Sequence, residues 1–195
     1  MRIYTRGGDK GETSLIYGRR IAKDHLRVET YGAVDEANAV LGVAAANLTD
    51  AGALDLCSIL TRVQRDLFDV GRDLATPEEK RADHYVTGGD VALLERLIDD
   101  LDARLPPLTR FVLPGGTPAA AHLHHARTVV RRAERRVVSL AKEGVSLPIV
   151  QQYLNRLSDL LFVLARTVNH RLQHDEPGVD FQAPKPEVIL DDKTI

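Results

Sequence analysis

The chain has 195 residues, of which 44% are hydrophobic and 28% charged, and its formal net charge is −2. This composition is typical of a soluble globular protein and excludes a disordered or membrane-spanning chain. The small net charge gives no electrostatic basis for binding nucleic acid or an anionic membrane, and 5% aromatic content without Trp argues against stacking on single-stranded bases. The single cysteine, Cys57, excludes an intramolecular disulfide and a cysteine-cluster metal site. With no apolar signal core, we expect one cytoplasmic domain over residues 1–195.

The first 22 residues are rich in Gly, Thr, Lys and Arg and show no helical period, which indicates an ordered loop with at most a short extended piece. Its glycines allow tight turns that aim backbone N–H groups at an anion. Lys10 and Arg6 add positive charge, and the hydroxyls of Thr13 and Ser14 suit a phosphate or a metal ion. The loop lacks the Gly-Lys-Ser/Thr tripeptide of a Walker motif. On composition alone an ordinary polar arm is the favoured interpretation, and an anion-binding loop is the alternative.

Helical periodicity then dominates the chain and predicts an all-α, five-helix bundle over residues 23–174, followed by a tail over 175–195. Pro106 and Pro107 end the third pattern, and the loop after it contains the turn Pro114-Gly115-Gly116. Pro148 suits the first turn of the last helix. The predicted helices cover residues 29–48, 53–74, 91–105, 119–142 and 148–174.

The fourth predicted helix carries an unusual concentration of arginine. At about 100° per residue, four of its charged side chains fall within one arc of roughly 100°, beside an alanine–valine stripe that should face the core. These four are Arg127, Arg131, Glu134 and Arg135. Arg132 and Arg136 point further round. Guanidinium forks suit phosphate oxygens, but a solvated basic face with Glu134 as an ion-pair partner explains the pattern equally well.

Two other helices carry polar side chains of interest. On the fifth helix Asn155 and Asp159 share a face with Phe162, and a core network is favoured there over a binding edge. On the first helix Asp35 could oppose an arginine of the fourth helix, within the subunit or across an interface, or could belong to an ordinary surface. His122 and His125 have helical-face spacing, but no carboxylate completes a metal triad, so no protein-bound metal centre is predicted.

Taken together, these motifs resemble the PduO-type ATP:cob(I)alamin adenosyltransferase family. The strings RRAERR (131–136) and YLNRLSD (153–159) are specific, whereas the glycine loop alone would not be. The matching segments follow the order of the family and span nearly the whole chain. They cover residues 5–11, 23–24, 31–36, 111–116, 127–136 and 153–159.

The resemblance implies a five-helix bundle that assembles as a homotrimer, with active sites between subunits and an N-terminal loop that wraps the triphosphate of ATP with Mg²⁺. By position it assigns nucleotide contacts to Thr5, Arg6, Gly7, Gly8, Asp9, Lys10, Thr13, Ser14, Lys23, Arg131, Arg132, Glu134, Arg135 and Asn155. Arg127 and Asp35 match an interfacial pair beside the corrin, and Phe111 matches the residue under the lower face of cobalt; with Arg131 they form the expected catalytic set. Many relatives have a polar residue where this chain has Gly7.

The implied reaction transfers the 5′-deoxyadenosyl group of ATP to cob(I)alamin, which forms adenosylcobalamin and releases triphosphate. Cob(I)alamin is itself a strong nucleophile, so the protein needs only to align the reactants and stabilise the departing charge. An apolar Phe111 under cobalt would exclude an axial ligand and ease reduction of Co(II). A reductase and an adenosylcobalamin-dependent acceptor enzyme are the expected partners. The alternatives are another ATP-dependent transferase on a helical bundle, or a non-catalytic module that docks through its arginines.

Overall fold

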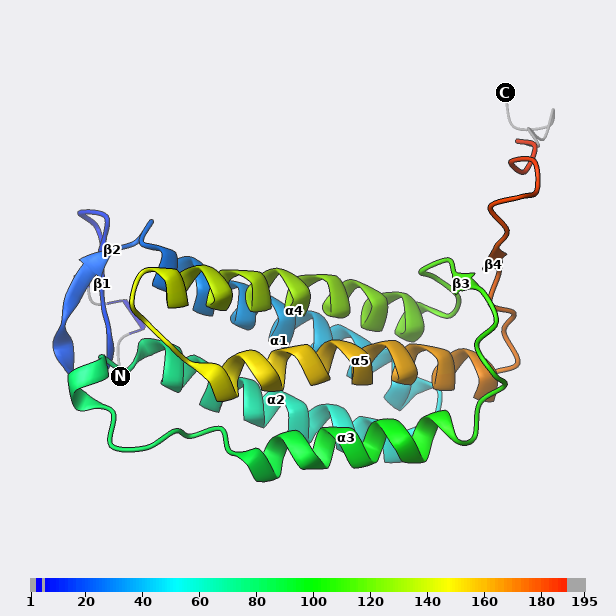
Figure 1. Cartoon of the computed structure of the whole chain (residues 1–195), viewed down its shortest axis with the longest axis horizontal. Helices are drawn as coiled ribbons and strands as arrows, with labels where there is room; N and C mark the ends of the chain where they lie inside the picture. The colour runs from blue at the N-terminus through cyan, green and yellow to red at the C-terminus, as the bar shows by residue number, and fades with distance from the viewer. Residues whose placement is uncertain (1–2, 5, 189–195) are drawn as a thin grey trace.

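The computed structural model describes residues 3–4 and 6–188, and a bundle of five α-helices forms most of it (Figure 1). The predicted all-α bundle is confirmed, with helix ends that differ from the predicted ones by a few residues. The helices are α1 (Leu26–Asp50), α2 (Leu54–Ala75), α3 (Gly88–Asp102), α4 (Pro118–Lys142) and α5 (Pro148–Arg171).

Local capping explains why three helix ends differ from the predicted ones. α1 starts earlier because the His25 ring accepts a hydrogen bond from the Arg27 N–H at 3.0 Å. α3 starts at Gly88 because Thr87 and Asp90 form a capping box. α5 ends at Arg171, and Gln173 just beyond it adopts a left-handed φ of 53°.

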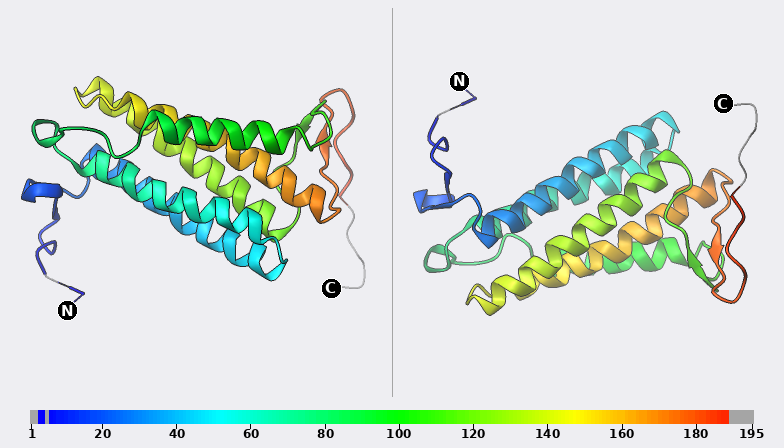
Figure 2. Two further views of the ribbon diagram at one scale, coloured as in Figure 1. Left: turned by 90° about the horizontal axis from the view of Figure 1, so that it is seen from below. Right: turned by 90° about the horizontal axis from the view of Figure 1, so that it is seen from above.

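The helices pack side by side in the order α2, α1, α4, α5, α3, which places α4 in the middle of the fold. α1 packs against α2 and α4, α5 packs against α4 and α3, and the views from below and above agree on this order (Figure 2). The stripe predicted to face the core is buried throughout; it comprises Ala126, Val130, Ala133 and Val137. In the part of the chain that the structure describes, no helix is long and apolar enough to cross a membrane.

Two small antiparallel sheets lie at opposite ends of the bundle (Figures 1 and 2). At one end β1 (Glu12–Ser14) pairs with β2 (Arg20–Ala22) around the 3₁₀ turn Ile16–Gly18. At the other end β3 (Phe111–Val112) pairs with β4 (Gly178–Val179). The patterns predicted an extended piece near β1 but no strand elsewhere, because two-residue strands leave no alternation to detect. Since α4 has 25 residues, the two sheets are separated by roughly 37 Å of helix.

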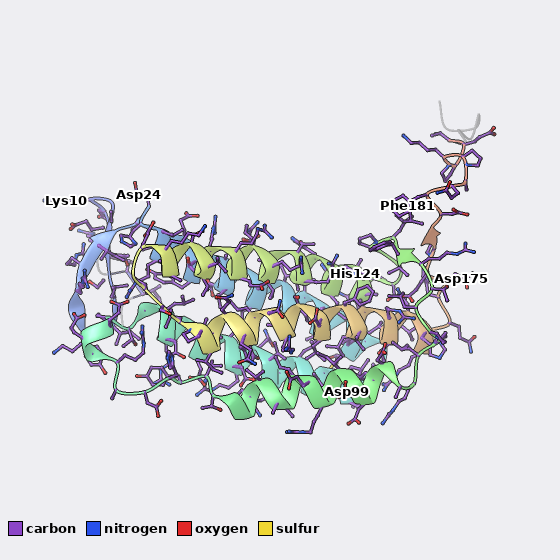
Figure 3. All side chains as sticks on the ribbon, in the orientation of Figure 1. Lys10, Asp24, Asp99, His124, Asp175 and Phe181 are labelled. Atoms are coloured by element: carbon purple, nitrogen blue, oxygen red, sulfur yellow. The ribbon has the colours of Figure 1, made fainter. Side chains whose placement is uncertain are left out.

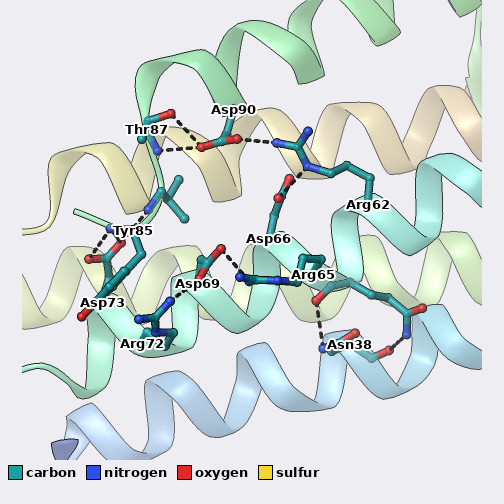
Figure 4. A network of polar contacts seen from close by, with 12 residues as sticks. Asn38, Arg62, Arg65, Asp66, Asp69, Arg72, Asp73, Tyr85, Thr87 and Asp90 are labelled. Carbon is teal, nitrogen blue, oxygen red and sulfur yellow. Dashed lines mark hydrogen bonds and ion pairs between the residues drawn. The ribbon is translucent and has the colours of Figure 1, made fainter.

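A polar network fastens α3 and the loop before it to the rest of the bundle (Figure 4). Arg62 on α2 pairs with Asp66, at 2.8 Å, and with Asp90 on α3. Asp66 is buried and accepts a hydrogen bond from the Tyr153 hydroxyl of α5 at 3.1 Å. Asp90 also accepts from the Thr87 N–H at 2.9 Å. One chain of ion pairs and hydrogen bonds therefore links α2, α3 and α5.

We expect Asp90→Asn to destabilise the fold by about 1–2 kcal/mol at pH 7, because it weakens a helix cap and removes an ion pair. Partial burial alone would raise the pKa of Asp90, but hydrogen bonds from Thr87 and the charge of Arg62 outweigh it and hold that pKa below its usual range. A carboxyl whose pKa is lowered by folding stabilises the folded state at pH values above its unfolded-state pKa of about 3.9. That contribution is lost as the pH falls through the folded-state pKa. Urea unfolding at pH 7 and near pH 2.5 should show a difference between wild type and variant that shrinks in acid; an equal difference at both pH values would contradict this account.

Candidate active site

The N-terminal segment folds as an arm around the β1–β2 hairpin at one end of the bundle (Figure 3). Arg20 holds it together, because its guanidinium donates to the Gly7 carbonyl at 2.8 Å and to the Ser14 hydroxyl at 3.1 Å. The Lys23 N–H donates to the Gly11 carbonyl at 2.8 Å, and Gly11 takes a left-handed φ of 80° that favours glycine. Sequence reasoning missed Arg20, since nothing in its local pattern distinguishes it from Arg19.

Within the arm, several of the predicted nucleotide contacts lie near one another. A Cβ atom added to Gly8 would meet the Lys23 ammonium at 3.0 Å, so the ammonium lies directly over the Gly8 backbone. Thr13 reaches Tyr31 on α1 by a side-chain hydrogen bond; burial raises the pKa of the Tyr31 phenol, and this bond partly offsets it. Arg6, Asp9 and Lys10 are exposed around the same turn. The predicted contact at Thr5 lies outside the described residues.

On the outer face of α4, no ion pair joins Arg127, Arg131 or Arg135 to a carboxylate among residues 3–4 and 6–188. Arg131 and Arg135 are exposed, and Arg127 is half-buried beside them. The Arg127 Nε is buried and has no hydrogen-bond partner among the described residues. Burial lowers the pKa of Arg127, and the neighbouring Arg131 lowers it further. A half-buried guanidinium that repels its neighbour is unfavourable unless an anion from outside the chain balances its charge.

The two arginines on the other edge of α4 are compensated within the chain. Arg132 pairs with Glu36 of α1, and Arg136 pairs with Glu29 at 2.7 Å. The Arg132 Nε is nevertheless buried and unpartnered within the part of the chain that the structure describes. Arg132 therefore combines a fixed orientation with remaining donor capacity, which suits a residue that holds an anion in place.

Glu134 and Asn155 meet between α4 and α5. The Asn155 side-chain amide donates to the Glu134 carboxylate at 3.0 Å, and Arg156 donates to the side-chain oxygen Oδ1 of Asn155 at 2.9 Å. The core network favoured for Asn155 and Asp159 is wrong, because Asp159 is exposed and Asn155 half-buried. Asn155 instead lies at the edge of the arginine face.

Asp35 lies away from these arginines. It lines a groove of about 380 Å³ between α1 and α2, together with Tyr31, Phe68 and Ile16 of the hairpin turn. No ion pair joins Asp35 to an α4 arginine among residues 3–4 and 6–188. Of the two partners considered for Asp35, the one within the subunit is therefore not formed.

Phe111 lies at the opposite end of the bundle from the arm, on β3 (Figure 1). Its side chain is 74% exposed and contacts only the edge of Phe181 in the tail among the described aromatic rings, with ring centroids 6.0 Å apart. The predicted site residues thus form four groups: the arm, the arginine face of α4 with Asn155, Asp35 in the groove between α1 and α2, and Phe111 on the strand before α4. A single chain keeps the first and the last apart by the length of α4.

The fold and this distribution of charge define a class: helical-bundle proteins that present a glycine-rich arm and an uncompensated arginine face to an anionic ligand. A family model described as cobalamin adenosyltransferase matches residues 3–168. The match covers most of the chain, and the chain therefore belongs to the cobalamin adenosyltransferase family.

Individual relatives agree with this assignment over most of their length. A corrinoid adenosyltransferase of Bacillus subtilis is 49% identical over 172 residues, with 88% of each chain covered. A corrinoid adenosyltransferase of Mycobacterium tuberculosis is 47% identical, with 86% of this chain and 89% of the relative covered. A solved variant of the PduO-type ATP:corrinoid adenosyltransferase of Lactobacillus reuteri, complexed with cobalamin and ATP, superimposes with a TM-score of 0.87 at 37% identity and covers 92% of this chain and 97% of its own.

We expect Gly8→Ala to weaken binding of tripolyphosphate about 3- to 10-fold, because the added methyl displaces the Lys23 ammonium from the arm and costs a charge-assisted contact. Isothermal titration with tripolyphosphate measures this directly. Gly88→Ala is the matched control, since a Cβ there meets nothing within 4 Å. Unchanged affinity of Gly8→Ala would show that the position of Lys23 over Gly8 does not matter for anions.

Proposed function

We propose that this chain transfers the 5′-deoxyadenosyl group of ATP to the cobalt of cob(I)alamin or a related reduced corrinoid and releases triphosphate. The observation that carries the proposal is the uncompensated arginine face of α4 together with a preformed glycine-rich arm, on the fold of a family named for this reaction. The solved relative that holds cobalamin and ATP together supports the same pair of substrates.

The residue inventory fits this chemistry. A cobalt–carbon bond forms while the bond between C5′ and the triphosphate oxygen breaks, and the bonding electron pair leaves with the triphosphate. The nucleophile belongs to the corrinoid substrate, so the chain has to orient the reactants and stabilise charge on the leaving group. In our assignment Arg131, Arg132 and Arg135 face that charge, and Asn155 with Glu134 fixes the nucleoside end.

Mg²⁺ is part of the proposal as an ion that accompanies the triphosphate. Among the described residues no group of three or more His, Cys, Asp or Glu side chains is placed to hold a metal ion. Mg²⁺ bound to polyphosphate keeps several water ligands and needs only one or two protein oxygens. The hydroxyls of Thr13 and Ser14 fit that limited role, and the ion would supply further charge neutralisation when it is bound.

We further propose that the active site is completed between subunits of a homotrimer. The arm and Phe111 lie at opposite ends of one bundle, whereas a single adenosyl transfer needs both near the same cobalt. A neighbouring copy brings the arm of one subunit to the α4 face of the next. The exposed Phe68, at 64%, borders the groove that contains Asp35 and suits burial against such a copy. Asp35 then becomes the missing anion for Arg127 across the interface.

The remaining assignments follow from this reaction. Residues 1–22 act as the ATP-binding arm, 23–174 as the bundle and 175–195 as a tail, all within one domain. Use of ATP and of a strongly reduced cobalt favours the cytoplasm, with a reductase that delivers the electron and an acceptor enzyme that takes the adenosylated product.

The direct test is anaerobic incubation of the protein with ATP and chemically reduced cobalamin. We expect the absorption spectrum of a cobalt–carbon bond to appear, with one intact triphosphate released for each bond formed. Phosphorus NMR identifies the products. Stoichiometric ADP, or no spectral change, would reject adenosyl transfer in favour of a phosphoryl transferase or a non-catalytic docking module.

The interfacial pair is tested by subunit complementation. Arg127→Asp and Asp35→Arg should each lower turnover about 100-fold, because each leaves two like charges facing one another in a partly desolvated contact. Mixed trimers refolded from the two variants contain interfaces with an intact Arg127 and an intact Asp35, so activity should return in the mixture. A mixture no more active than its components, with trimers shown by light scattering, would place the pair elsewhere.

A further inference from the structure

The strand that carries Phe111 is held by very little structure of its own. β3 and β4 contribute two residues each, and one further hydrogen bond, from the Leu113 N–H to the Pro177 carbonyl at 2.9 Å, extends their pairing. So short a ladder is not stable alone. The rings of Phe111 and Phe181 are 74% and 77% exposed, so burial of these rings does not fix them either. Their position has to come from an anchor elsewhere.

Asn169 on α5 is that anchor. Its side chain is buried, and the residue is 2% exposed. The amide oxygen accepts hydrogen bonds from the Thr117 N–H at 3.0 Å and from the Thr117 hydroxyl at 3.2 Å. The amide nitrogen donates to the Gly115 carbonyl at 3.2 Å and to the Glu176 carboxylate at 3.4 Å. All four hydrogen-bonding positions of one amide are thus used.

These four bonds reach both segments of the β3–β4 sheet. Gly115 and Thr117 lie in the turn that follows β3, and Glu176 precedes β4 in the tail. Thr117 also caps α4, since its hydroxyl accepts from the Ala120 N–H at 3.3 Å. Asn169 therefore ties the strand of Phe111, the tail and the start of the arginine-bearing helix to one point.

The surrounding residues are shaped around this amide. A Cβ at Gly116 would meet the Asn169 oxygen at 2.3 Å, and Gly116 has a φ of 100°, so the turn can pass over Asn169 only as glycine. Arg166, one turn earlier on α5, holds Glu176 from the other side at 3.3 Å and donates to the Pro106 carbonyl at 2.8 Å. Arg166 thus orients the carboxylate that Asn169 binds.

We propose that Asn169 is a positioning residue for the corrinoid half of the reaction: through Gly115, Thr117 and Glu176 it fixes Phe111 relative to α4. The inference rests on the proposed function, in which Phe111 covers one face of cobalt. Phe111 acts on the axial position of Co(II), so a displaced Phe111 impairs the one-electron reduction to Co(I). The subsequent attack of Co(I) on C5′ depends on the arm and the arginines, which Asn169 does not touch.

Asn169→Asp is the informative variant, because it keeps the oxygen that Thr117 uses but loses the donor and sets a carboxylate against Glu176. Turnover from cob(II)alamin with a reduced flavin, which supplies one electron to cobalt, should fall about 10- to 100-fold, the loss typical of a misplacement near 1 Å. Turnover from cobalamin already reduced to Co(I) by titanium(III) should fall less than about threefold, since the reactants there are aligned by other groups. The EPR spectrum of bound cob(II)alamin with ATP should show a smaller four-coordinate fraction.

Adding Glu176→Gln to Asn169→Asp separates positioning from loss of stability. In the double variant the amide introduced at position 176 donates to the carboxylate introduced at position 169 and still accepts from Arg166, and the net charge equals that of the wild type. The EPR signal and the flavin-dependent turnover should recover only in part, because the Gly115 carbonyl still lacks the hydrogen bond from position 169.

Asn47→Asp is the control for destabilisation, because it places a carboxylate in the last turn of α1. It should lower the thermal midpoint without changing the EPR spectrum.

The possible outcomes distinguish a failure of the positioning role of Asn169 from a failure of the proposed function. A wild-type chain that makes no cobalt–carbon bond from ATP and Co(I)-cobalamin would overturn the proposed function and the inference with it. A wild-type chain that makes this bond, while Asn169→Asp keeps the wild-type EPR signal and Phe111→Ala loses it, would overturn the inference alone. Equal losses in both turnover assays would also overturn it. If Asn169→Asp does not fold, Glu176→Ala, which frees the exposed tail from Asn169, should give the same split between the two assays.

Discussion

The structure depends on one electrostatic constraint: α4 brings several guanidinium groups together on a face for which the chain supplies too little negative charge. Arg132 and Arg136 have carboxylate partners on α1, but Arg127 and Arg131 repel one another beside a buried alanine–valine stripe. Solvent screens the exposed Arg131, whereas the half-buried Arg127 is screened less. An anion would complete such an arrangement, and in the proposed trimer the two candidates are the triphosphate of ATP and Asp35 of a neighbouring subunit.

The length of the bundle determines how that anion can be used. A straight α4 holds the arm at one end and Phe111 at the other, so neither can approach the other by a side-chain movement. The same rigidity has an advantage, because helices packed along their whole length hold reacting groups more precisely than loops do. In the proposed trimer, the separation that prevents a site within one chain lets each subunit contribute its arm to one site and its Phe111 to another.

Periodicity predicted the five helices, and the arginine arc predicted which face of α4 stays outside, because both follow from a repeat of 3.6 residues. The β3–β4 sheet, Arg20 and Asn169 were beyond that reasoning. Each acts through contacts between segments far apart in sequence: Asn169 reaches Gly115 across 54 residues, and it stands among other polar residues near the end of α5, so nothing local marks it as buried. The prediction of a core network at Asp159 was wrong for a related reason. Helical spacing places a side chain on a face but does not reveal whether another helix covers that face.

In the proposed reaction, the two ends of the bundle divide the chemistry according to what each kind of group does well. Cations and backbone N–H groups stabilise a leaving triphosphate but would do nothing for a cobalt ion that has to lose an axial ligand. In the proposed reaction Phe111, exposed on a short strand, would serve the second purpose, because an aromatic ring excludes water and offers no lone pair to the metal. Such a ring gains nothing from solvent exposure in the free protein, so its position has to be fixed by polar contacts behind it. In our proposal the fully bonded, buried amide of Asn169 provides those contacts, so a residue that touches neither substrate contributes to the site.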